Sequence, residues 1–319
     1  MSTVITNNML SLIDARLKTC VLETNATIPL IGSKIVKEKK TTSKYEIMNR
    51  IVGVGEAEEV AEGAVYPKKA IKQDTSKTVN MKKFGFVIDV SRELIVDNLF
   101  GPIQDDVAKA MKNAMLQTKE RRILNMLNNG FTATTGQLAQ DGLSLFNTAH
   151  VLVQGGTQSN RASVNAALDL DSLWIGRNTM QTTKGNSGLY DAIYPAKYLV
   201  VPQELERRAH ELVKSEWIPQ STENTANVIG SIAAKLEVLT SPLLSSTTAW
   251  FLIADPSAVL EFSLRFFNRE EMSIHSLFNI QGNTELGNAI DKDTYSWRVR
   301  ERYECDTPTW YGVYGNVGA

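Results

Sequence analysis

The stretch from Lys82 to Asp106, KKFGFVIDVSRELIVDNLFGPIQDD, constrains the fold of this chain more than any other. Apolar residues alternate along its first half, which is the pattern of a strand with one buried face. These residues are Phe84, Phe86, Ile88 and Val90. Pro102 suits the first turn of a helix, and Asp105 and Asp106 suit its positive N-terminal end. The stretch therefore predicts a strand that runs through a capped turn into a helix.

The helix is predicted to continue to residue 129. Apolar or small residues recur along it at three- and four-residue spacing. They are Ile103, Val107, Ala110, Met111, Ala114, Met115, Thr118, Ile123, Met126 and Leu127. Asn128, Asn129 and Gly130 form a stop signal. At 1.5 Å per residue the helix would be roughly 40 Å long, which suits the spine of a subunit.

The segment before this strand, residues 45–90, predicts a charged hairpin with little apolar content to bury. One strand starts at Tyr45, and the other returns from Thr78. The loop between them is first acidic and then basic, so it can pair with complementary patches on a neighbouring subunit. The candidate contact residues are Glu56, Glu58, Glu59, Glu62, Lys68, Lys69, Lys72 and Lys77. A solvent-exposed loop without a partner is the alternative interpretation.

The N-terminal 44 residues are interpreted as an arm. Apolar residues spaced by three and four predict a short amphipathic helix from Met9 to Leu22. The Lys-rich tract from Ser33 to Lys44 is interpreted as a solvated linker. An extended arm that lies on another subunit is the alternative for this tract.

The remaining chain predicts further short elements and an aromatic C-terminal region. The expected helices begin near Asp169 and Pro202, and the expected strands are Tyr198–Val201, Ile232–Leu239, Ala249–Ala254 and Tyr295–Tyr303, with Val259–Phe267 either strand or helix. Aromatic residues near the end of the chain suit either an interface or a core. They are Trp297, Tyr303, Trp310, Tyr311 and Tyr314.

Composition excludes several classes of protein. The 319 residues are 43% hydrophobic and carry a net charge of −1, so a large nucleic-acid-binding surface is not expected. No apolar run approaches the ~20 residues of a membrane span, and the N-terminus lacks the pattern of a secretory signal. Synthesis in the cytoplasm is therefore expected, where the two cysteines, Cys20 and Cys305, would remain thiols.

The motifs of enzymes and metal sites are also absent from the sequence. His210-Glu211 begins a zinc-protease motif, but Lys214 stands where the second histidine belongs. His150 and Asp141 suggest an acid–base pair, yet no nucleophile elbow accompanies them. No phosphate loop occurs, and the acidic residues from Glu56 to Glu62 lack the spacing of a calcium loop. We therefore expect no catalytic residue, no cofactor and no metal site.

Five segments of the chain, in this order, are informative together: FVIDVSRELIVDN from Phe86, DGLSLF from Asp141 with His150, YLVVP from Tyr198, WFLIADP from Trp250, and WRVR from Trp297 with Tyr303. Taken together they resemble the major capsid protein of tailed bacteriophages. The resemblance is to the Hong Kong-97-type fold and, more narrowly, to the Mu-like major head subunit family. It implies an α+β fold with an N-terminal arm (1–44), an extended hairpin loop (45–92), a peripheral domain (93–164) with the spine helix 102–129, an axial domain (165–290), and return strands of the peripheral domain (291–319).

The resemblance also implies a function. The chain would be a virion protein that assembles with itself, in the bacterial host cytoplasm, into hexamers and pentamers of an icosahedral shell. Its partners would be a scaffold, a maturation protease and a portal protein, with packaged double-stranded DNA nearby and no membrane. The arm is short, which implies a separate scaffold or earlier proteolysis, and no covalent crosslink between subunits is predicted. An encapsulin-like compartment of the same fold is the alternative, and a soluble enzyme would require a discrete pocket.

Overall fold

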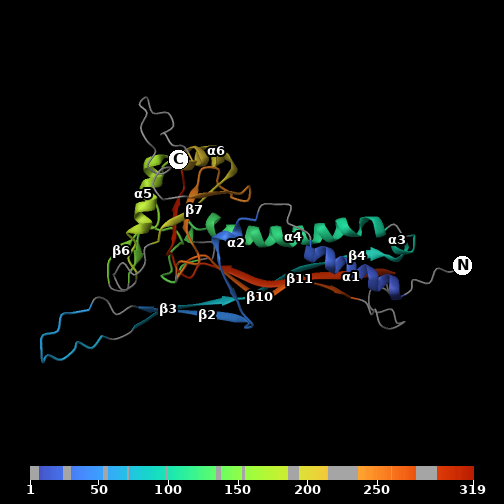
Figure 1. Ribbon diagram of the computed structural model, residues 1–319, viewed down its shortest axis with the longest axis horizontal. Helices are drawn as coiled ribbons and strands as arrows, with labels where there is room; N and C mark the ends of the chain where they lie inside the picture. Colours follow the sequence, from blue (N-terminus) through green and yellow to red (C-terminus); the bar gives the residue numbers. More distant parts are fainter. Residues whose placement is uncertain are drawn as a thin grey trace.

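The computed structural model describes residues 7–23, 30–52, 57–69, 72–97, 100–133, 138–152, 155–185, 194–214, 236–259, 261–277 and 293–319. These residues form an α+β fold with two four-stranded sheets and two short two-stranded ones. The molecule is elongated, and a long helix runs beside the first four-stranded sheet toward the second (Figure 1).

The first sheet, called the main sheet below, has the strand order β1-β10-β11-β4. Its strands are β1 (Lys37–Lys40), β4 (Lys82–Ser91), β10 (Arg265–Ser276) and β11 (Thr294–Asp306). Only the β1–β10 pair is parallel among these described pairings. Along β4, Phe84, Phe86, Ile88 and Val90 are less exposed than the residues between them. The alternating strand predicted from the sequence is therefore confirmed.

Helices cover one face of this sheet. They are α1 (Asn7–Glu23), α3 (Arg92–Val96) and α4 (Phe100–Asn128). Their apolar side chains pack with the inward side chains of the sheet, and Ile13, Met111, Met115, Trp297 and Val299 are among the buried residues. The predicted spine helix and the predicted N-terminal helix are thus both confirmed, although Ile103, Ala110, Ala114 and Thr118 of the predicted stripe are exposed. The buried stripe is therefore narrower than the sequence predicts.

The second sheet has the order β12-β9-β7-β8. Its strands are β7 (Ala196–Val201), β8 (Glu237–Thr240), β9 (Trp250–Ala254) and β12 (Val313–Asn316), with α5 (Leu170–Gln181), η2 (Gln203–Leu205) and α6 (Glu206–Lys214) beside it. Gly176 lets α5 approach β12, because a Cβ there would lie 2.7 Å from the Tyr314 ring. The C-terminal aromatic residues lie in the core: Trp297, Tyr303, Trp310, Tyr311 and Tyr314 are each at most 2% exposed.

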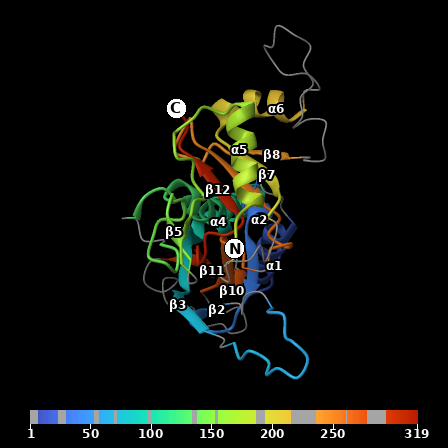
Figure 2. The ribbon, with the colours of Figure 1, turned by 90° about the vertical axis from the view of Figure 1, so that its left-hand side faces the viewer.

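The charged hairpin is formed by β2 (Tyr45–Val52) and β3 (Lys72–Asn80), which pair antiparallel. The predicted returning strand is broken at Met81: its first part pairs with β2, and its second part is β4 of the main sheet. The hairpin projects from the body at the end of the main sheet (Figures 1 and 2). Little of the chain therefore covers it.

The interpretation of Ser33–Lys44 as a solvated linker is wrong. This tract forms α2 (Gly32–Ile35) and β1, which extends the main sheet. Several of its lysines form ion pairs within the chain: Lys34 contacts Glu237 at 2.5 Å and Lys40 contacts Glu271 at 2.7 Å. An edge strand with exposed charged side chains is polar by necessity, so its composition resembles that of a linker.

Other expectations are only partly covered by the described residues. The strand expected from Ile232 is seen as β8, and residues 232–235 lie outside the described part. The segment Val259–Phe267, predicted as either strand or helix, is strand from Arg265 onward, where β10 begins. A separate two-stranded sheet joins β5 (His150–Val151) to β6 (Thr157–Gln158). In the part of the chain that the structure describes, no helix combines the length and the apolar character needed to cross a bilayer.

Candidate inter-subunit contact sites

The tip of the hairpin, residues 57–69, is here called the hairpin limb. It has no regular secondary structure, and nearly all of its residues are exposed. Val65 is 88% exposed and Tyr66 is 79% exposed, so two adjacent apolar side chains project from the limb into solvent. The limb therefore offers both charge and apolar surface to a partner.

The charged candidate residues fall into three groups. Glu58, Glu59, Glu62, Lys68 and Lys69 lie on the hairpin limb, where the Lys69 ammonium is 3.4 Å from the Glu58 carboxylate. Lys72 is in β3 but its side chain is outside the described part, and Glu56 lies outside it entirely. Lys77, in contrast, forms an ion pair with Asp306 of β11, in the body of the chain.

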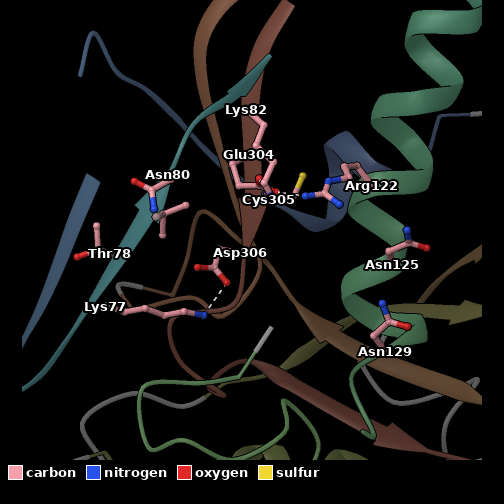
Figure 3. Close-up of a pocket in the computed structure, with 11 residues that line it drawn as sticks. Lys77, Thr78, Asn80, Lys82, Arg122, Asn125, Asn129, Glu304, Cys305 and Asp306 are labelled. Atoms are coloured by element: carbon pink, nitrogen blue, oxygen red, sulfur yellow. Dashed lines mark hydrogen bonds and ion pairs between the residues drawn. The ribbon is translucent and has the colours of Figure 1, made fainter. Parts of the chain in front are cut away.

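Lys77 closes one end of a cleft at the root of the hairpin (Figure 3). Its ammonium is 2.6 Å from the Asp306 carboxylate and 2.6 Å from the carbonyl oxygen of Leu138. The Lys77 side chain is only 20% exposed. Its charge is therefore used within the subunit, and it fixes the base of the hairpin against β11.

The cleft opens between the hairpin root, α4 and the end of β11, where β3 diverges from the main sheet. Its volume is about 440 Å³, and it is lined by Lys77, Thr78, Val79, Asn80, Lys82, Arg122, Asn125, Asn129, Glu304, Cys305 and Asp306. Inside it, Arg122 lies 2.6 Å and Lys82 lies 2.9 Å from the Glu304 carboxylate. The ion pairs tie the hairpin root, the spine helix and β11 to one another.

The cleft walls are polar and offer several hydrogen-bonding side chains. Asn125 on α4 and Asn129, directly after the end of α4, both line the cleft (Figure 3). Burial raises the pKa of the Cys305 thiol, so this cysteine stays protonated and is a poor nucleophile. Sequence reasoning missed the cleft, since its residues come from three distant segments.

His150 and Asp141 do contact each other, but they form a structural node. The His150 ring is fully buried and its Nδ1 lies 2.5 Å from the Asp141 carboxylate. Its Nε2 lies 3.1 Å from the side-chain oxygen of Asn160, and the ring stacks on Trp310 at 4.6 Å between centroids. Both ring nitrogens are occupied and no solvent reaches them, so the pair holds two loops together.

A second buried node joins the N-terminal arm to the spine helix. The Glu120 carboxylate accepts hydrogen bonds from the backbone N–H groups of Ile31 and Gly32 at 2.9 and 2.8 Å. Burial raises the pKa of Glu120, although the two backbone donors oppose this shift. Among the described residues, no three His, Cys, Asp or Glu side chains are grouped closely enough to hold a metal ion.

Comparison with solved structures defines the class of fold. The chain is similar to a protein in the procapsid of bacteriophage JBD30, with 13% identity and a TM-score of 0.51 over 98% of this chain and 75% of that one. It is similar to a chain of Microbacterium phage Oxtober96, with 14% identity and a TM-score of 0.53 over 93% of both chains. It is also similar to a chain of Mycobacterium phage Adephagia, with 12% identity and a TM-score of 0.55 over 94% of this chain and 92% of that one. The fold is thus that of phage capsid subunits, the Hong Kong-97-type fold.

The sequence itself places the chain in a family. Residues 74–316 match the model of a family described as phage capsid protein. The chain therefore belongs to this phage capsid protein family. A search of curated proteins finds no match.

Proposed function

We propose that the chain is the major head subunit of a tailed bacteriophage, in the Mu-like group, and forms hexamers and pentamers of an icosahedral shell around double-stranded DNA. The observation that carries the proposal is the hairpin limb. It projects from the body and exposes large apolar residues, Val65 and Tyr66, that its own subunit leaves uncovered. Such a surface is stable in water when a neighbouring subunit covers it.

The proposed division of labour follows the domain layout expected from the sequence. The hairpin loop (45–92) holds neighbours, whereas the arm (1–44) packs through α1 and β1 on its own subunit. The peripheral domain (93–164 and 291–319) stiffens the subunit through its spine, and the axial domain (165–290) meets other copies at the capsomer centre. Ion pairs in the cleft support a rigid hairpin root, since Lys77 and Lys82 both bind acids of β11. Many modest contacts of this kind sum to a stable shell while each remains reversible during assembly.

The proposed role is structural, not enzymatic. A scaffold, a maturation protease and a portal protein would assist the assembly in the host cytoplasm, and the subunit would remain in the virion. Packaged DNA would lie beside the shell without sequence-specific contacts. The net charge of −1 supports this, because a strongly basic wall would bind the genome tightly.

Removal of the hairpin limb tests the proposal. A variant that lacks residues 57–69 is expected to fold, with a Tm within about 4 °C of the wild type, because the limb contributes nothing to either buried cluster. Its yield of closed shells, counted by negative-stain electron microscopy and sedimentation, is expected to fall at least roughly tenfold when it is co-expressed with the scaffold. Normal shells from this variant would contradict the clamp role.

A matched variant separates the apolar contacts of the limb from its length. Val65→Ser with Tyr66→Ser keeps the limb intact and is expected to lower shell yield by less than the deletion does.

Nuclease-resistant DNA in wild-type particles would indicate a virus head. Particles with a packaged protein cargo and no DNA would instead indicate an encapsulin-like compartment.

A further inference from the structure

The main sheet has an outer face, turned away from α1 and α4, that concentrates positive charge. Along β11, the inward side chains Trp297 and Val299 belong to the buried cluster, so the residues between them point outward. These outward residues include Arg298, Arg300 and Arg302. Arginine therefore occupies three successive outward positions of one strand.

The strand register completes this face. Lys83 of β4 is directly opposite Arg302, Gly85 is opposite Arg300, and Val87 is opposite Arg298. Gly85 has a packing reason, since a Cβ there would lie 2.2 Å from the Val299 carbonyl oxygen. We call the set of Lys83, Arg298, Arg300 and Arg302 the basic face.

Only part of this charge is neutralised within the subunit. Glu270 of β10 accepts a hydrogen bond of 2.8 Å from Arg300 Nε, and it lies 3.4 Å from Arg302 Nε. Among the described residues, Lys83 and Arg298 form no ion pair. The basic face therefore retains net positive charge, with its arginines on the inner strand β11 and Lys83 on the edge strand β4.

The opposite charge occurs on the same chain, at the hairpin limb. Glu58, Glu59 and Glu62 are exposed there, and only Glu58 has an ion-pair partner within the described limb. A limb cannot reach the basic face of its own subunit, because the hairpin extends away from the sheet (Figure 1). Opposite charges on two separate surfaces of one chain favour a head-to-tail contact between copies.

The dimensions and apolar residues of the two surfaces also match. From Lys83 to Val87 the strand advances about 13 Å, and the irregular segment from Glu58 to Glu62 would span about the same distance if it became extended on docking. Val87 is 46% exposed at one end of the basic face, and the limb exposes Val65 and Tyr66. A contact between these surfaces would cover apolar area as well as pair charges.

We propose that the acidic hairpin limb of one subunit docks on the basic face of a second copy. This inference rests on the proposed shell function and names the surface that the limb recognises. Arginine forks suit this role, because the planar guanidinium binds a carboxylate through two parallel hydrogen bonds. Arg298 and Lys83 supply the unpaired charge, while Glu270 holds Arg300 and Arg302 in place.

A charge swap tests the docking. Lys83→Glu with Arg298→Glu reverses the basic face, and Glu59→Lys with Glu62→Lys reverses the limb. Each reversal alone is expected to reduce shell yield roughly tenfold, because like charges then meet across the contact. The combined variant is expected to restore the yield to within about twofold of the wild type, because opposite charges meet again.

A matched control distinguishes local pairing from net charge. Asp97→Lys with Glu204→Lys, two exposed carboxylates elsewhere on the subunit, restores the net charge of the reversed face without changing the limb. This combination is expected to leave the yield low. Equal rescue by this pair and by the limb reversal would overturn the proposal.

The remaining outcomes are also decisive. Normal shells from the face reversal overturn the docking but not the proposed function. If those normal shells also retain less DNA, the basic face would be assigned to nucleic acid instead. A wild type that forms no shells with its scaffold overturns the proposed function and the docking together. If the double face reversal lowers the Tm of the subunit, Lys83→Glu alone, on the exposed edge strand, serves with the same expected rescue.

Discussion

At the scale of single residues, Glu120 shows how one buried side chain holds a whole segment. Replacement by Ala leaves the backbone N–H groups of Ile31 and Gly32 without an acceptor, so we expect a loss of about 2–4 kcal/mol in the free energy of unfolding. Glu120→Gln keeps one oxygen acceptor and is expected to lose less. Urea unfolding of unassembled subunits measures the stability of both variants. Equal stability of Glu120→Ala and the wild type would contradict a stabilising role for these two hydrogen bonds.

The raised pKa of Glu120 also predicts a pH dependence. Below the ordinary glutamate value of 4.5 the group is protonated in the folded and unfolded chains alike. As the pH rises through the higher folded pKa, the folded chain must ionise a buried carboxyl, so its stabilising contribution is lost. Relative to Glu120→Gln, the wild type is therefore expected to lose stability between pH 4.5 and neutral pH, as urea midpoints at several pH values would show. A constant difference between the two proteins would refute this.

Asp141 has the opposite behaviour. Burial raises the pKa of this carboxyl, but the hydrogen bond and charge of His150 and the backbone N–H of Leu143 outweigh burial and hold the pKa below its ordinary value of 3.8. Its contribution to stability is thus present above that value and is lost as the pH falls through the lower folded pKa. We expect Asp141→Asn to be less stable than wild type at pH 6, with a difference that shrinks in acid. Urea unfolding across the acid range tests this, and a difference that grows in acid would be inconsistent with the node.

At the scale of elements, local periodicity predicted the helices and strands whose own sequence pattern is strong enough to be recognised without their packing partners. The pattern of Phe84 to Val90 is visible without knowing what it packs against, and the spine helix is long enough to signal itself. The strand β1 was missed because Lys37 pairs with Arg265, far away in the sequence, and no apolar alternation marks it. Lys40 of this strand contacts Glu271, which only the folded chain brings near.

The same distinction applies to the candidate contact sites. The charged hairpin limb was predicted from composition, and the structure places it outside the core. The cleft was not predicted, since Arg122 and Glu304 meet only after α4 packs on β11. A signal for the basic face does exist in the sequence, in the alternation of Trp297-Arg298-Val299-Arg300, but a single sequence does not reveal that Lys83 lies beside it.

At the scale of the whole molecule, two buried clusters meet along one helix. Met111 and Met115 of α4 belong to the cluster with α1 and the main sheet, whereas Ile123 and Leu127 belong to the cluster around the second sheet. Neither cluster includes any residue of the limb. The chain therefore has a packed body and a limb that projects from it without joining either cluster.

Hydrogen exchange of backbone amides measures this division directly. In isolated subunits, amides of the second half of α4 are expected to exchange slowest, because Ile123–Leu127 are buried in a large cluster, and limb amides are expected to exchange fastest. On assembly the limb should gain protection of roughly a hundredfold or more, as opening then requires breaking contacts with a second copy. The edge strand β4 should gain protection in the same particles if the limb docks beside it. Shells in which residues 57–69 exchange as fast as in the isolated subunit would contradict a clamping limb, whereas protection of the limb without protection of Lys82–Ser91 would place its partner on another surface.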